Sequence, residues 1–274
     1  MKRDDYNHYK NEIQQIMLGK HPFNLGEKFM NGLECLGAVK RFYDSCDDKE
    51  KSLLRKTIIE MLDSSVLNEK EDAIGLSEEL KIEEAIPKLL KLTTSFEILN
   101  DVSVCITLAS ALATLRVNKA KPFFLSFLHH YDHPEAFDWR DPDKMEWYKK
   151  ENPSICVTPI SLIGLVSVDL DAALEYIHKF FSWDTELLIT KDEWGYKSST
   201  LFINLFCCFM WVLKVYGEES LYRVLEKIRT YPDIQSKREF VIGALTKTLN
   251  DFPPKWVDDK KKKELIEKAQ ETLS

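Results

Sequence analysis

The sequence contains little glycine and none of the loops that usually carry nucleotides or a reactive serine. Only 9 glycines occur among 274 residues. Folds rich in β-sheet need many tight turns, and glycine most readily supplies the positive φ angles of such turns. The low glycine count therefore favours helices. No glycine-rich phosphate loop and no Gly-x-Ser-x-Gly motif is present, so the usual signatures of a nucleotide site and of a serine nucleophile are both missing.

A membrane-spanning run and paired cysteines are also missing. The most hydrophobic run, Leu201–Val215, is shorter than the roughly 20 residues needed to span a bilayer, so we expect a buried helix and no membrane association. The first residues are charged and polar, unlike a secretory signal, which predicts a cytoplasmic protein. The six cysteines show no paired spacing and are expected to be free, buried thiols. We expect no cofactor and no metal.

Basic residues are outnumbered by acidic ones. The chain has 38 Lys and Arg against 45 Asp and Glu, which gives a net charge of −7 and a pI of about 5.5. A nucleic-acid-binding surface needs concentrated Lys and Arg, so nucleic acid is not the expected partner. The acidic balance fits a soluble protein, or one that binds a basic partner.

One pattern occurs twice, with the second copy 35 residues after the first. Residues 80–90 match residues 115–125 in their apolar positions and in one proline. Apolar residues precede each copy at three- and four-residue steps, as in a helix with one apolar face. Pro87 and Pro122 then fall in the opening turn of a second helix, where a missing N–H costs little. Each copy therefore predicts two helices and a turn.

The expected starts of the first helices follow from capping residues. One helix is expected to begin at Asn68, with Glu71 completing a capping box, and the other at Asn100 or Asp101. Neither helix pair could bury its apolar stripe alone, so the pairs are expected to stack on their neighbours.

The runs EEAIPKLLKL and NDVSVCITLASALATL resemble the short HEAT-like repeats first associated with phycobilisome lyases, over about Ala73–Leu128. In place of that family's LGD turn the chain has Leu80–Glu83 and Leu115–Asn118. The resemblance implies an all-α fold, a right-handed α-solenoid of stacked antiparallel helix pairs of the HEAT-like or armadillo-like kind. HEAT-like modules mostly serve as protein-binding scaffolds, and a minority act on DNA or chromophores.

The whole chain is expected to form a single α-solenoid domain with five to six helix pairs and no strand. Capping helices are expected in 1–64, two regular units in 68–130, an aromatic and acidic insertion in 131–155, and divergent units in 156–274. In the last part, a buried helix is expected at 200–215, and helices at about 234–250 and 257–272 are separated by Pro253 and Pro254.

Aromatic and acidic residues in two irregular intervals are the predicted partner-binding residues. Trp and Tyr are enriched at binding hot spots, and flanking carboxylates can meet Arg or Lys of a partner. The alternative is that these rings fold back on the helices as a lid. The residues are Asp138, Trp139, Asp141, Asp143, Trp147, Tyr148, Trp183, Asp184, Asp192, Glu193 and Trp194.

Two further clusters have simpler explanations. His129, His130 and His133 lie within a few residues of two carboxylates, but zinc needs three or four converging ligands, and histidines near a helix end can instead meet free carbonyls. The run Lys260–Lys263 has the charge of a phosphate-binding tail, but glutamates alternate with it along the last helix, which favours a solvated helical face.

We therefore expect a non-enzymatic module that recognises another protein through a HEAT-like concave surface. An immunity or inhibitor protein that blocks a basic effector, or an adaptor, fits the acidity. The alternative is an enzyme of the HEAT-like alkyl-base DNA glycosylase type, which uses Trp and Asp residues in a concave groove. Such an enzyme needs a cationic track for the nucleic-acid backbone, and no expected helix supplies one. The sequence leaves the oligomeric state and the identity of the partner open.

Overall fold

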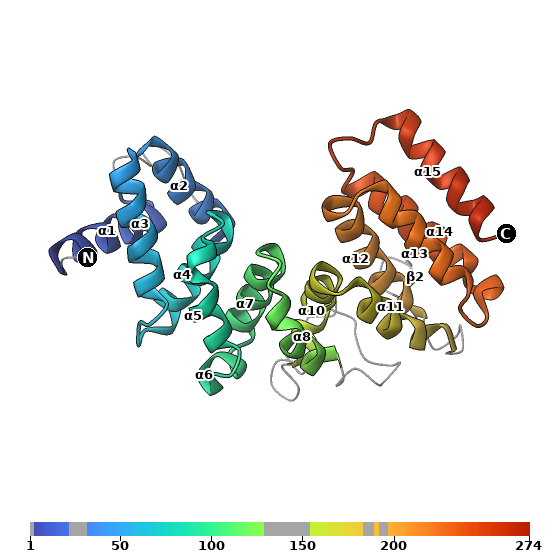
Figure 1. Ribbon diagram of the computed structural model, residues 1–274, viewed down its shortest axis with the longest axis horizontal. Coiled ribbons are helices and arrows are strands. Elements are labelled where there is room, and N and C mark those ends of the chain that lie inside the picture. The colour runs from blue at the N-terminus through green and yellow to red at the C-terminus, as the bar shows by residue number, and fades with distance from the viewer. Residues whose placement is uncertain (1–2, 22–31, 129–153, 183–188, 192–196) are drawn as a thin grey trace. The chain divides into compact units, whose positions relative to one another are not determined.

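Helices make up nearly all of the described structure. The computed structural model describes residues 3–21, 32–128, 154–182, 189–191 and 197–274 (Figure 1). The one exception is a short antiparallel pair of strands, β1 (Ile189–Lys191) and β2 (Lys197–Ser199). The all-α class is thus confirmed, and the sequence pattern gave no sign of this strand pair.

The chain divides into two compact units, Met1–Val117 and Asn118–Ser274. The single domain expected from the sequence stays a prediction. The described helices of the first unit are α1 (Arg3–Met17), α2 (Gly32–Ser45), α3 (Asp48–Met61), α4 (Leu67–Glu79), the 3-10 helix η2 (Glu83–Ala85), α5 (Ile86–Leu92), α6 (Phe96–Leu99) and α7 (Val102–Thr114).

In the first unit, consecutive helices pack as neighbours. α1 lies against α2 and α3, both of these lie against α4, and α4 lies against α7. α5 reaches α3 through Lys88, whose ammonium donates to the Ile59 carbonyl at 2.8 Å and to the Asp63 carboxylate at 2.6 Å. Carboxylates of α4 and hydroxyls of α7 fix their register, because Glu78 accepts hydrogen bonds from Ser110 and Thr114 at 2.9 and 2.8 Å.

The two copies of the sequence pattern share an unusual backbone turn. Lys81 and Arg116, which are equivalent in the two copies, have φ angles of 50° and 52°. At each turn the following residue donates its N–H back into the helix, from Ile82 to Ser77 at 2.9 Å and from Val117 to Leu112 at 3.0 Å. These are Schellman turns, which close a helix with one left-handed residue. A 3-10 helix and a second α-helix follow each turn.

The predicted helix starts are confirmed in part. Asp101 caps α7 by accepting from the Val104 N–H at 3.1 Å, and Pro87 is the second residue of α5. The capping box expected at Asn68 is wrong, since α4 begins at Leu67 after Val66, which makes no side-chain cap bond. The carboxylate of Glu71 instead binds Ser103 and Thr107 of α7.

The second unit is built from longer helices. Its described elements are η3 (Asn118–Ala120), α8 (Lys121–Leu128), α10 (Ser154–Val168), α11 (Leu170–His178), η4 (Lys179–Ser182), α12 (Thr200–Val215), α13 (Glu218–Arg229), α14 (Ile234–Asp251) and α15 (Asp259–Thr272). Pro122 is the second residue of α8, as predicted. α12, α14 and α15 agree with the helices expected at 200–215, 234–250 and 257–272.

These helices form two layers in the second unit (Figure 1). α10 packs on α12 and α12 on α14, which makes one layer from the first helix of each contacting pair. α11 packs on α13 and α13 on α15, which makes a second layer. Each first helix also contacts the helix that follows it, so α10 with α11, α12 with α13 and α14 with α15 are contacting pairs. Side chains with no exposed surface, including Phe180, Phe181 and Phe209, fill the interior.

Candidate functional site

The predicted partner-binding residues lie outside the described residues. This holds for every one of them: Asp138, Trp139, Asp141, Asp143, Trp147, Tyr148, Trp183, Asp184, Asp192, Glu193 and Trp194. The histidines at 129, 130 and 133 also lie outside. Their proposed roles stay predictions, and a candidate site has to come from the described helices.

A groove between α11 and α13 is a candidate site among the described residues of the second unit. It encloses about 600 Å³, a volume within the usual range of ligand pockets. The lining residues come from these two helices and the turn after α13. They are Leu170, Asp171, Leu174, Glu219, Tyr222, Arg223, Val224, Glu226, Lys227 and Thr230.

Residues just before α11 and α13 determine where these two helices begin. Asp169 caps α11 by accepting from the Ala172 N–H at 3.0 Å, and the Lys121 ammonium donates to the same carboxylate at 2.6 Å. The Lys121 hydrogen bond is the main reason why the pKa of Asp169 lies below its ordinary value. Gly217, just before α13, has a φ of 81°, a conformation that a residue with a Cβ adopts only at a cost.

The two sides of α13 are electrostatically different. On the side of α15, the Glu218 carboxylate accepts from Lys261 at 2.8 Å and from the Tyr222 hydroxyl at 2.6 Å. Lys268 of α15 lies over the Tyr222 ring, 3.7 Å from its centroid. The hydrogen bond from Lys261 is the main cause of the lowered pKa of Glu218. This side is therefore occupied by interactions within the unit.

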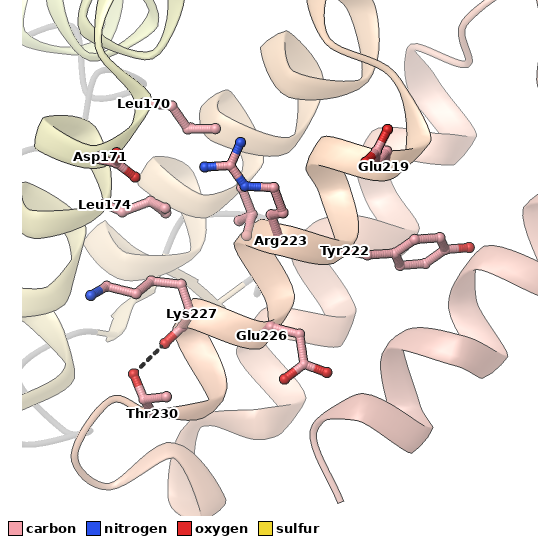
Figure 2. A pocket seen from close by; sticks show the side chains of 10 residues that line it. Leu170, Asp171, Leu174, Glu219, Tyr222, Arg223, Glu226, Lys227 and Thr230 are labelled. Carbon is pink, nitrogen blue, oxygen red and sulfur yellow. Dashed lines mark hydrogen bonds between the residues drawn. The ribbon is translucent and has the colours of Figure 1, made fainter.

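On the other side of α13, Arg223 and Lys227 extend toward α11. Figure 2 shows both side chains on the groove side, with Leu170, Asp171 and Leu174 across from them. The two cations lie one helical turn apart, so they share a face of the helix. Both are exposed, and within the described part of the chain neither forms an ion pair. They are available to carboxylates or main-chain carbonyls of a bound molecule.

The groove combines apolar and charged surface. Leu174 and Val224 are almost fully buried beneath it. Three carboxylates, those of Asp171, Glu219 and Glu226, accompany the two cations. An apolar floor with charges of both signs on its walls suits a polypeptide better than a uniformly charged polymer.

Features of catalytic chemistry are few in the described residues. Burial raises the pKa of the thiols of Cys105, Cys207 and Cys208 to about 12, so these cysteines are not thiolate nucleophiles at neutral pH. In the described ranges, no group of three or more His, Cys, Asp or Glu residues is arranged to hold a metal ion.

The expected burial of the cysteines is confirmed for these three, whereas Cys35 and Cys46 are half-buried. None of the described helices is both long and apolar enough to cross a bilayer.

Arg223 and Lys227 were not among the residues predicted from the sequence. The apolar spacing of Leu221, Val224 and Ile228 does predict the buried face of α13, and it places the two cations on the exposed side of the helix. The missing information was that α11 lies beside that face, a contact between residues about 50 positions apart. No protein-family model matches the chain, and no curated protein shows significant similarity to it.

Proposed function

We propose that this chain is a non-enzymatic protein-interaction module built from HEAT-like repeats, arranged as a right-handed α-solenoid of five to six stacked helix pairs. Two observations support the architecture. The equivalent left-handed residues Lys81 and Arg116 indicate one turn used twice, and the second unit packs its helices in two layers. Stacked helix pairs of this kind present extended surfaces for partners.

The groove between α11 and α13 is the observation that carries the proposed function. Arg223 and Lys227 form no ion pair among the described residues, whereas Glu218 on the opposite side of the same helix is bound by Lys261 and Tyr222. Exposed, unpaired cations over an apolar floor offer both steering and contact area to a polypeptide. Within this class, an adaptor fits the groove cations, whereas an immunity protein that inhibits a basic effector is supported by the net charge of −7 alone.

Affinity capture from a lysate of the source cells tests this function. The Arg223→Glu/Lys227→Glu variant should lose the partner that the wild type recovers, because it reverses both groove cations. Lys260→Glu/Lys263→Glu on α15 makes the same charge change at exposed lysines outside the groove and should retain it. A parallel Trp139→Ala/Trp147→Ala variant tests the aromatic insertion. Equal recovery by the wild type and the α13 variant would count against the groove.

The alternative, a DNA glycosylase of the HEAT-like type, is disfavoured by the charges of the groove. Three carboxylates line it beside two cations, and carboxylates repel the phosphate backbone. Release of an alkylated base from an oligonucleotide by the purified chain would reverse this ranking.

A further inference from the structure

A second groove lies in the first unit, along α3, and has a different charge. It encloses about 440 Å³ between α3, the end of α2 and the start of η2. The lining residues are Tyr43, Asp48, Lys51, Ser52, Arg55, Lys56, Ile59 and Glu84. Three cations line this groove against two carboxylates, although the chain as a whole is acidic.

Tyr43 and Arg55 form the centre of this groove. Tyr43 is only 8% exposed, and its hydroxyl oxygen accepts from the Arg55 Nε at 2.6 Å. Because the oxygen acts as the acceptor in that bond, the hydroxyl hydrogen is still available as a donor, and no acceptor for it occurs in the described residues. A part-buried hydroxyl donor beside a guanidinium is suited to an anionic oxygen.

The cations of the groove differ in how far they are paired with carboxylates. Lys51 and Lys56 form no ion pair among the described residues. The guanidinium of Arg55 forms an ion pair with Glu84 at 3.7 Å, a distance too long for a hydrogen bond, and both side chains are exposed, so this pair is weak. Lys51 lies 5.8 Å from the centroid of the Tyr43 ring, so this cation, the arginine and the hydroxyl are close together. Ser52 adds one more unpaired hydroxyl.

We propose that the α3 groove binds an acidic polypeptide segment, with a glutamate or aspartate carboxylate held by Arg55 and the Tyr43 hydroxyl and a neighbouring carboxylate held by Lys51 and Lys56. The lining carries three cations against two carboxylates, a net positive charge that favours an anionic ligand. The volume exceeds that of a single small anion, which points to several side chains of a polypeptide. This inference rests on the proposed function only in taking the ligand to be a polypeptide.

Fluorescence anisotropy with short labelled peptides tests the proposal on the full chain. The probes are a peptide of alternating Glu and Gly and its Gln–Gly analogue, at low salt. We expect the Glu peptide to bind at least about tenfold more tightly than the analogue, and Arg55→Gln and Lys51→Gln each to weaken it about tenfold, as expected for the loss of one charged hydrogen bond. Tyr43→Phe, which removes only the hydroxyl, should weaken binding by a smaller factor.

Lys49→Gln is the matched control, because Lys49 is an exposed lysine of the same helix that does not line the groove. It should bind like the wild type. Equal affinity of the wild type, Arg55→Gln and Lys51→Gln for the Glu peptide would overturn the proposal. Displacement of the peptide by inorganic phosphate or duplex DNA at equal charge concentration would overturn the assignment to a polypeptide.

The outcome is separable from that of the proposed function. Loss of partner capture in Arg223→Glu/Lys227→Glu reports on the second unit, whereas these peptide titrations report on α3 alone. Peptide binding at α3 without any groove-dependent partner would leave this inference standing and the proposed function refuted. Partner capture without peptide binding would refute this inference and leave the proposed function standing.

Discussion

Asp72 is a carboxyl group whose pKa is raised in the folded protein. It lies half-buried on α4, and burial, followed by the nearby Glu71 and Glu69, raises its pKa from 3.8 to about 6. A carboxyl whose pKa is higher in the folded state than in the unfolded state opposes folding above the folded pKa. This penalty disappears as the pH falls below the unfolded pKa.

Replacing Asp72 should therefore stabilise the protein at neutral pH. We expect Asp72→Asn to increase the free energy of unfolding by about 1 kcal/mol at pH 7.5, after an allowance for solvent near this half-buried group. The gain should shrink as the pH falls from about 6 to about 4. Thermal unfolding followed by circular dichroism at several pH values measures it, and Asp44→Asn, at an exposed position of α2, controls for the loss of one surface charge. A gain independent of pH would contradict this explanation.

At the scale of the helices, close packing explains why α8 and α10 lie together. A Cβ on Gly164 of α10 would lie 2.2 Å from a ring carbon of Phe124 in α8, and the Phe124 side chain is fully buried. The ring thus occupies the space that the missing side chain leaves, and it has no room to move in a close-packed interior.

Gly164→Ala should destabilise the second unit for this reason. Overpacking of this kind costs about 1–3 kcal/mol, which exceeds the gain of about 1 kcal/mol from a better helix former. Gly243→Ala in α14 is the matched control, because the added methyl group would lie 3.4 Å from the Phe202 ring, an ordinary contact. Urea unfolding should show a lower midpoint for the first variant only. A midpoint equal to or above that of the wild type for Gly164→Ala would contradict the packing argument.

The sequence was sufficient to predict where several helices lie. It was not sufficient to predict which side chains bind one another. The apolar spacing and the prolines located α5, α8, α12, α14 and α15 within about two residues. The start of α4 was missed because Glu71 pairs with hydroxyls of α7, and such tertiary contacts override local capping preferences. The strand pair was missed because each strand has only three residues, too few for an alternating pattern.

The candidate sites, like the side-chain partners, depend on tertiary contacts that the sequence does not reveal. Arg223, Lys227, Lys51 and Arg55 are ordinary surface cations in the sequence, and only the neighbouring helices make them walls of grooves. The residues that the sequence did select, such as Trp139 and Trp194, lie outside the described residues. Composition and periodicity therefore predicted the all-α class, whereas the partner-binding residues that they selected stay predictions.

For the whole molecule, a polypeptide partner is proposed to bind in the groove between α11 and α13. Hydrogen–deuterium exchange of the full chain, free and with the captured partner, tests it most directly, since bound backbone exchanges more slowly. We expect slower exchange in α11 and α13 at the groove, with little change in α14, which belongs to the other layer of helices. Slower exchange in α14 with unchanged α11 and α13 would contradict it.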